Sequence, residues 1–449
     1  MAILLIPIYT RYLSPIEYGI IDLFIIVGAI INIAISLEIT QAIGRFYHDT
    51  KDEDEKMSYT STAFLYTLVV YILYFIFSYI LAEPFTIFLL DDIKYQNIFI
   101  LASLAITTNG VFYFVQNQLK WQIQPKDSII CAIVNAFVTA LIAIYLLVNT
   151  NFKVESVFIG QVFGNLISSL LSIYYAKSSY LIVFNFSKFK EMIKFTYPLT
   201  LTSIGVFTSM YIDRIAIKDL LGLEELGIYG IAARFASVTA ILMLGFQSSL
   251  IPLVYKHYKE KETPKNISKI FTVFSFFALL LVCSSIVFSK EVLFLFTTES
   301  FYSASSLISF MVMSALLSNM YIFAPGIGIA KKTKITLFIT VLGAVLNTIL
   351  NYALIPLFNV NGATYATLIS STIVFFLYVT FSNRYYKITY RWKILFFCLL
   401  ISLSSAITIN SSFVIVSITS MLSKAIYILI LACILIHLLF DTKNLKFNT

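Results

Sequence analysis

Long apolar stretches alternate along this chain with short polar or charged segments. A membrane-spanning helix needs about 20 mostly apolar residues. In the first half such helices are expected near 1–12, 18–44, 60–82, 96–118, 128–148, 156–176 and 195–217. In the second half they are expected near 227–254, 270–288, 302–328, 335–356, 362–382, 394–410 and 422–440. The pattern predicts an all-α integral membrane protein with about 14 transmembrane helices.

The first stretch differs from the others. "MAILLIPIYTRY" is too short to cross a bilayer and contains Pro7. It has no basic n-region and no small-residue cleavage site, so it does not read as a signal peptide. We interpret residues 1–12 as part of a first helix, with a truncated or misassigned start of the chain.

Composition supports a lipid environment. The chain is 59% hydrophobic and 12% charged with a mean hydropathy of +0.89, whereas soluble domains carry about 25% charged residues. The net charge of +8 is spread over short loops rather than gathered on one face, which argues against nucleic acid as a partner. Three histidines and four cysteines are scattered, so we predict no metal site and no cofactor, and we expect the cysteines to be buried.

Loop charge orients the helices. Cytoplasmic loops carry an excess of Lys and Arg. With the N-terminus inside, inner loops hold 23 of the 31 basic residues. Outer loops hold six, namely Arg11, Lys94, Lys153, Lys218, Lys290 and Lys424. The alternation never inverts, which predicts an inner-membrane protein with both termini in the cytoplasm. The remaining two, Arg214 and Arg234, fall inside predicted helices.

Two short turns recur half a chain apart. "LSPIEYGI" at 13–20 matches "LGLEELGI" at 221–228 in Leu, Glu, Gly and Ile. A second pair begins "FKVESVFIG" at Phe152 and "FNVNGATYA" at Phe358. We expect two six-helix bundles related by a pseudo-two-fold axis along the membrane normal, as in many transporters. The predicted parts are a bundle at 1–177, an amphipathic cytoplasmic linker at 178–194, a bundle at 195–382 and two further helices at 394–440.

The same residues carry a family resemblance. "LIPIYTRYLSPIEYGIIDLF", "ITQAIGRFYHD" and "YIDRIAIKDLLGLEELGIYGIAARF" resemble the polysaccharide transport family. These are O-antigen and capsule repeat-unit flippases of the multidrug/oligosaccharidyl-lipid/polysaccharide superfamily. The resemblance spans most of the chain, although its motifs are loose and mostly structural. It implies a flippase whose partners are undecaprenyl-diphosphate-linked oligosaccharides, membrane lipids, a coupling H⁺ or Na⁺ and polysaccharide polymerase machinery.

Polar residues inside apolar helices are the candidates for chemistry, because a charge in the bilayer is costly unless it faces water or a partner. One face of the eighth predicted helix carries Gly227, Gly230, Arg234, Ser237, Ile241, Gly245 and Ser248. Arg clamps phosphate oxygens and amides bind sugar hydroxyls. The predicted substrate-binding residues are Arg234, Arg214, Asp213, Asn347, Asn351, Asn109 and Asn117. Each has a structural alternative: an ion pair, a side chain reaching the headgroups, or helix–helix glue.

Two acidic residues are candidates for coupling to an ion. Glu38 is predicted about a turn and a half from the inner end of its helix, and Asp22 near an outer end, where solvent exposure would make it ordinary. In addition, "APGIG" at 324–328 is expected to kink its helix. Gly160 and Gly164 form a GxxxG packing signal.

Three function classes compete. A flippase for lipid-linked oligosaccharides is the main prediction. A multidrug or cation antiporter of the same superfamily would concentrate acidic residues in its cavity, and Arg214 and Arg234 argue mildly against it. A membrane polymerase or glycosyltransferase would carry a long external loop with catalytic residues. No catalytic pattern is found, so the chain is not expected to be an enzyme.

Overall fold

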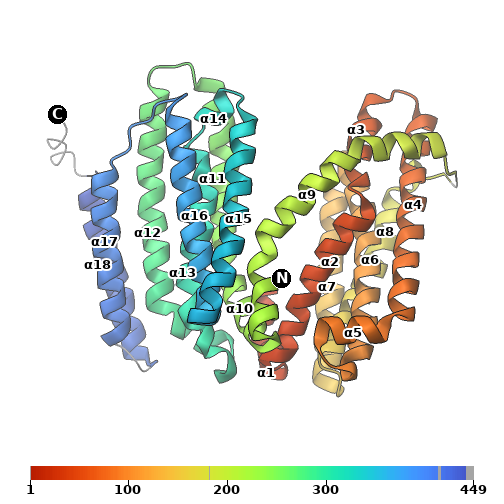
Figure 1. Ribbon diagram of the computed structural model, residues 1–449, viewed down its shortest axis with the longest axis horizontal. Coiled ribbons are helices and arrows are strands. Elements are labelled where there is room, and N and C mark those ends of the chain that lie inside the picture. Colours follow the sequence, from red (N-terminus) through yellow and green to blue (C-terminus); the bar gives the residue numbers. More distant parts are fainter. Residues whose placement is uncertain (1, 182, 413–415, 441–449) are drawn as a thin grey trace. The chain divides into compact units, whose positions relative to one another are not determined.

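The computed structural model describes residues 2–181, 183–412 and 416–440, and within these ranges the regular secondary structure is helical, with no strand. The predicted all-α class is therefore confirmed. Among the described residues, 12 helices are long and apolar enough to cross a membrane. Two other predicted stretches, 1–12 and 195–217, lie in α1 (Ala2–Tyr12) and α9 (Phe186–Leu221). The chain divides into two compact units, each with its long helices side by side (Figure 1).

The first unit comprises residues 12–211. Its helices are α2 (Pro15–Ser36), α3 (Ile39–Asp49), α4 (Glu53–Ile80), α5 (Ala82–Leu90), η1 (Ile93–Tyr95), α6 (Gln96–Trp121), α7 (Pro125–Asn149), α8 (Val154–Tyr175), η2 (Lys177–Ser179) and most of α9. A buried core at one end of this unit joins α3, α4, α6 and α9 through side chains that include Ile43, Ala63, Val115 and Met192.

The second unit comprises residues 2–11 and 212–449. After α1 and the end of α9 come α10 (Leu223–Ala236), α11 (Val238–His257), α12 (Thr263–Phe296), η3 (Glu299–Ala304), α13 (Ser305–Asn319), η4 (Met320–Phe323), α14 (Gly326–Ile329), α15 (Thr333–Phe358), α16 (Val360–Asn383), α17 (Trp392–Ser412) and α18 (Ile418–Phe440). The helix α1 groups with this unit: Thr298 donates to the Thr10 carbonyl at 3.0 Å.

Local sequence explains where some helices begin. Ser14 and Glu17 form a reciprocal capping box at the start of α2, and Pro15 occupies the first helical position. This is the turn whose copy at 221–228 starts α10 after Gly222, whose φ is +96°. Gly222 takes this conformation without the strain a side chain would add.

Three predicted helices are broken in the structure. The stretch 18–44 divides into α2 and α3 at Leu37 and Glu38, and 227–254 divides into α10 and α11 at Ser237. The stretch 302–328 ends as α13 at Asn319, and Pro325 caps the short α14, so the helix is interrupted near "APGIG", where a kink was predicted. Hydropathy alone does not locate such breaks, because apolar residues continue on both sides of each of them.

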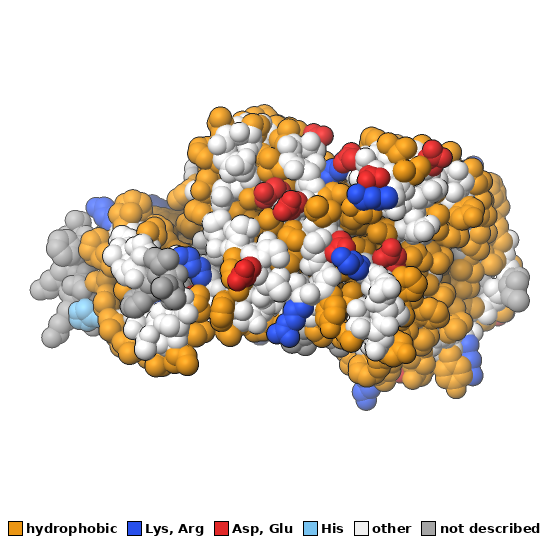
Figure 2. All heavy atoms as spheres, turned by 90° about the horizontal axis from the view of Figure 1, so that it is seen from below, with side chains coloured by type: hydrophobic (Ala, Val, Ile, Leu, Met, Phe, Trp, Pro, Cys, Tyr) orange, Lys and Arg blue, Asp and Glu red, His pale blue; other side chains and the backbone are white. Residues whose placement is uncertain are grey.

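The surface matches a lipid environment. Large apolar side chains stand far into the surroundings, for example Phe88 at 73% and Leu357 at 72% exposure. Figure 2 shows hydrophobic side chains over much of the visible surface, with charged ones single or in small groups among them. Such exposure would be unfavourable in water and is ordinary for helices that face acyl chains.

Candidate substrate site

The first unit contains a polar cavity lined by α2, α6, α7 and α8 and by Tyr211 of α9. Its volume is about 440 Å³. Five amide side chains line it: Asn32, Asn109, Asn135, Gln161 and Asn165. None of the described lining residues is charged. The cavity therefore offers neutral donors and acceptors within apolar helices.

Four of the five amides are hydrogen-bonded in two pairs. Asn135 Nδ2 donates to Asn165 Oδ1 at 2.9 Å. Asn165 Nδ2 lies 3.3 Å from Thr108 Oγ1. In the second pair, Asn32 Nδ2 lies 3.4 Å from Asn109 Oδ1. These bonds fix the side-chain orientations, while each Asn retains further hydrogen-bonding capacity for a ligand.

Close helix packing brings α7 and α8 amides together. A Cβ added to Gly160 would lie 2.7 Å from the Thr139 carbonyl oxygen, and one added to Gly164 would lie 2.0 Å from Thr139 Oγ1. The predicted GxxxG packing signal is therefore confirmed, since small residues let the two helices approach. The approach places Asn165, next to Gly164, against Asn135.

A glycine also makes room for a tyrosine beside the cavity. A Cβ on Gly110 would lie 2.0 Å from Tyr71 Cζ, so the Tyr71 ring occupies the space a side chain would take. From there the Tyr71 hydroxyl donates to Asn32 Oδ1 at 2.5 Å. The bond turns the Asn32 amide nitrogen toward Asn109.

Two predicted amides of α6 have different surroundings. Asn109 lines the cavity, as expected of a substrate-binding residue. Asn117 does not line it; it accepts a hydrogen bond from Lys120 Nζ at 3.0 Å near the end of the helix. Asn32, Asn135, Gln161 and Asn165 were missed, although amides inside apolar runs are the same signal that singled out Asn109.

Asp213 and Arg214 lie together in the second unit. Tyr229 of α10 donates a hydrogen bond to Asp213 Oδ2, and the Arg214 amide donates to Asp213 Oδ1 at 2.8 Å. The Arg214 guanidinium lies 5.8 Å from the centre of the Tyr229 ring. These contacts give both side chains protein partners, so they tie α9 to α10.

The other predicted residues of the second unit lie on α10 and α15. The Arg234 guanidinium and the Tyr9 hydroxyl of α1 interact electrostatically. Asn347 and Asn351 are buried on one face of α15. Asn351 Nδ2 donates to Asn347 Oδ1 at 2.9 Å, while the Asn351 Oδ1 atom is buried and has no hydrogen bond from a described residue.

Neither coupling candidate has the predicted surroundings. Asp22 is buried at 5% exposure, which corrects the expectation of an exposed outer position. Glu38 lies at the break between α2 and α3, where Leu37 and Glu38 have φ of 48° and 54°. Such left-handed conformations are unfavourable for residues with a Cβ. Near this break, the Tyr66 hydroxyl donates to the Ile35 carbonyl at 2.9 Å.

A buried ion pair joins α12 and α18. Lys424 Nζ bonds to Glu291 Oε1, and the two side chains are 0% and 2% exposed. Lys424 was predicted in an outer loop, and this is wrong: it lies inside α18. A lysine in an apolar helix requires a partner, and Glu291, more than 100 positions away, could not be identified from sequence. Cys433, predicted to be buried, is exposed on the same helix.

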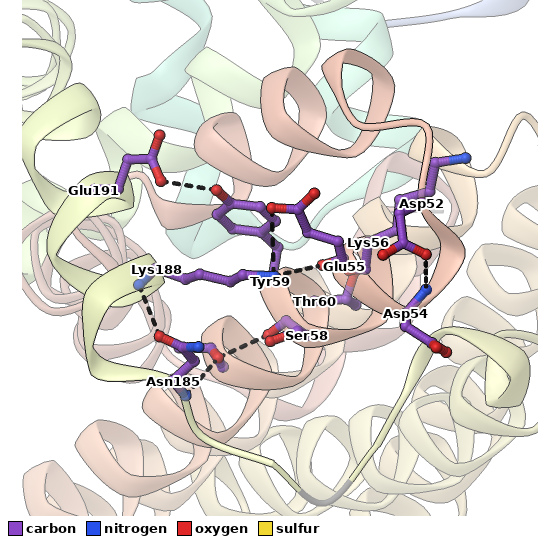
Figure 3. Close-up of polar contacts among 11 residues, drawn as sticks. Asp52, Asp54, Glu55, Lys56, Ser58, Tyr59, Thr60, Asn185, Lys188 and Glu191 are labelled. Carbon is purple, nitrogen blue, oxygen red and sulfur yellow. Dashed lines mark hydrogen bonds and ion pairs between the residues drawn. The ribbon is translucent and has the colours of Figure 1, made fainter.

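A second polar cluster holds the start of α9 within the first unit (Figure 3). The Tyr59 hydroxyl donates to Glu191 Oε2 at 2.7 Å. Lys188 Nζ donates to the Glu55 carbonyl at 3.2 Å and lies 4.5 Å from the centre of the Tyr59 ring. The two charged residues of α9 thus bind the first turns of α4.

The segment before α9 is held in the same way. The Leu181 amide donates to Ser61 Oγ at 2.6 Å and the Asn185 amide to Thr62 Oγ1 at 3.0 Å. The Tyr180 ring packs against Phe64 of α4, with ring centres 4.8 Å apart, and burial raises the pKa of its hydroxyl. Much of the predicted linker 178–194 is therefore fixed to the first unit by backbone and side-chain bonds.

The described chain has two helical units, 12 helices long and apolar enough to cross a membrane, and a polar cavity in its first unit. Comparison with known proteins identifies its family. A family model described as polysaccharide biosynthesis protein matches residues 1–257, and one for MatE matches residues 198–353. The first match covers more than half of the chain, so the protein belongs to the polysaccharide biosynthesis protein family. No curated protein sequence matches the chain.

Solved structures agree with this fold. The lipid II flippase MurJ, in an inward closed conformation, is similar with a TM-score of 0.68 and 16% identity, covering 98% of this chain and 99% of MurJ. An inward-facing multidrug resistance MATE family transporter of the MOP superfamily is similar with a TM-score of 0.64 and 15% identity, covering 84% of this chain and 92% of the transporter. A MOP superfamily transporter from Pyrococcus furiosus is similar with a TM-score of 0.57 and 14% identity, covering 85% of this chain and 90% of that transporter. The chain has the MOP superfamily fold.

Proposed function

We propose that the protein is a flippase that moves undecaprenyl-diphosphate-linked oligosaccharide repeat units from the cytoplasmic to the outer leaflet for O-antigen or capsule synthesis. The carrying observation is the cavity of the first unit, whose walls present amides and no described charge. Sugar hydroxyls both donate and accept hydrogen bonds, as amides do. A neutral, amide-lined cavity suits a glycan better than a cationic drug.

The family match supports the same substrate class. Polysaccharide biosynthesis is the description attached to the model that covers residues 1–257. In this proposal the oligosaccharide contacts Asn109, Gln161 and their neighbours while the polyprenyl chain stays in lipid. Alternating access then moves the headgroup outward. Coupling to H⁺ or Na⁺ through Glu38 or Asp22 stays a prediction.

The multidrug antiporter is the competing function, since MATE transporters share the fold. A cation site inside a membrane protein needs acidic side chains to offset the loss of hydration. The described lining of the 440 Å³ cavity includes none. The lack of acidic side chains in this described lining therefore favours a neutral glycan over a cationic drug as the substrate.

The sidedness of lipid-linked sugars in a deletion strain tests the proposal. Membrane vesicles of known orientation are treated with a glycosidase that cannot cross the bilayer. We expect repeat units to accumulate on the cytoplasmic face and to reach the outer face again when the gene is restored. Normal sidedness together with new sensitivity to cationic drugs would instead establish the antiporter.

A further inference from the structure

The segment that runs from the end of α16 into the first turn of α17 is strongly basic. Arg384, Lys387, Arg391 and Lys393 fall within ten residues, 384–393, which contain no acidic residue. Arg384, Lys387 and Lys393 are exposed, and Arg391 is half-buried. No described carboxylate forms an ion pair with any of the four. We call residues 384–393 the basic segment.

The basic segment is held in place by polar contacts. Ser268 of α12 donates from Oγ to the Thr389 carbonyl at 2.8 Å. The Tyr390 hydroxyl donates to the Phe323 carbonyl, and the Ile388 amide lies 3.2 Å from Asn383 Oδ1. Bonds on both sides of Thr389 fix the backbone, so the charges are presented from an ordered scaffold.

The acidic residues that precede α12 do not neutralise this charge. Glu260 pairs with His257 at 2.6 Å, and Glu262 pairs with Lys265 at 3.8 Å. Lys269, one turn further along α12 and exposed, adds another positive charge on the helix that Ser268 ties to the segment. The positive charge at this end of the second unit is therefore not balanced locally.

An apolar cavity begins at the same place. It lies between α12, α13, α16 and α17 and has a volume of about 340 Å³. Its described lining is apolar except for Ser275 and Thr372. Phe376 and Phe396, two of its walls, remain 52% and 63% exposed, so the cavity opens on the side that faces lipid.

Trp392 connects the basic segment to the cavity. It belongs to both, and its ring lies 5.4 Å from Tyr390, 5.9 Å from Phe271 and 6.0 Å from Phe376. Trp is enriched at the boundary between headgroups and hydrocarbon. The positive charge of the basic segment therefore lies at headgroup level, directly beside the opening of the apolar cavity. An apolar chain would fill this cavity favourably.

We propose that this is a binding site for an anionic phospholipid. Its phosphate lies on the basic segment and one acyl chain enters the apolar cavity past Trp392. Basic pockets between membrane helices bind anionic headgroups in this manner. In the orientation that the loop charges predict, the lipid belongs to the inner leaflet. The site is in the second unit and is separate from the amide-lined cavity.

The protein carries its own probe for this site. Trp121 and Trp392 are its two tryptophans, so Trp121→Phe leaves Trp392 alone. The variant is placed in nanodiscs of phosphatidylcholine with increasing amounts of lipid brominated in the acyl chain, which quenches tryptophan on contact. We expect brominated phosphatidylglycerol to quench at about a fivefold lower mole fraction than brominated phosphatidylcholine, the preference one basic residue near an anionic lipid confers.

Matched charge removals locate the site. Lys387→Gln, Arg391→Gln and Lys393→Gln together should abolish the preference for phosphatidylglycerol. Removing three charges from the end of α11 and the α11–α12 connection by Lys256→Gln, Lys259→Gln and Lys261→Gln should leave it. Ala278→Phe, which fills the cavity, should reduce quenching by both lipids. Equal quenching by the two lipids in the starting variant, or equal loss in both charge variants, would overturn the proposal.

Discussion

At the scale of single residues, identical side chains on one helix have different surroundings. Asn109 and Asn117 are both amides of α6, two turns apart. Asn109 faces the amide-lined cavity and bonds to Asn32, whereas Asn117 is paired with Lys120 near the helix end. Comparing substitutions at these two positions therefore distinguishes a role in substrate binding from the general effect of replacing an amide in α6.

This gives the first prediction. Asn109→Leu removes a cavity amide without opening a void, so export of surface glycan should fall by about tenfold, the effect of losing one or two hydrogen bonds to substrate. Asn117→Leu should retain export. Surface glycan is measured with a lectin and protein amount by immunoblot. Equal export by the two variants would remove Asn109 from the binding site.

Tyr71 and Gly110 give the second prediction. Gly110→Ala places a Cβ on the Tyr71 ring, so we expect a loss of about 1–3 kcal/mol in stability from overpacking. Tyr71→Phe keeps the ring and loses only the bond to Asn32, for about 0.5–1.5 kcal/mol. Thermal unfolding in detergent compares them. A Gly110→Ala protein as stable as the parent would show that the ring can move aside at no cost.

At the scale of helices, the ion pair between α12 and α18 gives the third prediction. Lys424→Met alone leaves Glu291 buried without its cation, which should cost about 3–5 kcal/mol. The swap of Glu291→Lys with Lys424→Glu should recover much of that loss. The effect is measured as the resistance of α17 and α18 to proteolysis in each variant and in the parent protein. If the single variant were as resistant as the parent, the pair would not hold these helices together.

Sequence predicted the helices better than their interruptions. Hydropathy located the apolar stretches because lipid demands them. It missed the breaks at Leu37–Glu38 and Ser237. Beside the first of them, the Tyr66 hydroxyl bonds to the Ile35 carbonyl, a contact between helices that hydropathy does not record. Pro325 was different: its missing backbone N–H is a local signal, and a kink near it was predicted.

The site residues followed the same rule. Asn109 was found because an amide inside an apolar helix is conspicuous, but which amides share a cavity depends on how α7 and α8 pack. Arg214 was interpreted as a residue reaching the headgroups or a phosphate, and its actual neighbours, Asp213 and Tyr229, come from two helices. A hydropathy pattern does not identify which side chains of different helices are in contact.

At the scale of the whole molecule, the loop charges predict its orientation, which is the fourth prediction. Two single-cysteine variants test it in a background from which the native cysteines are removed. Lys51→Cys lies between α3 and α4, on the predicted cytoplasmic side, and Asn149→Cys lies at the last residue of α7, on the predicted outer side. Both positions are exposed. A membrane-impermeant maleimide should label Asn149→Cys in intact cells and Lys51→Cys only after lysis. The reverse pattern would invert the topology.

The class of the molecule was also predictable. Composition established a membrane protein, and the family resemblance agrees with the polysaccharide biosynthesis match over residues 1–257. The assignment of residues 2–11 to the second unit was not predicted. It rests on contacts such as Thr298 with Thr10, which join residues far apart in sequence.

The distribution of tryptophan has a practical consequence. Trp121 belongs to the first unit and Trp392 to the second, so each unit contains one native fluorophore. Trp121→Phe and Trp392→Phe therefore yield two proteins whose emission reports on one half each. Denaturation curves of the two variants would coincide if the halves melt cooperatively and separate if they do not. The chain thus offers a label-free measure of how independently its halves fold.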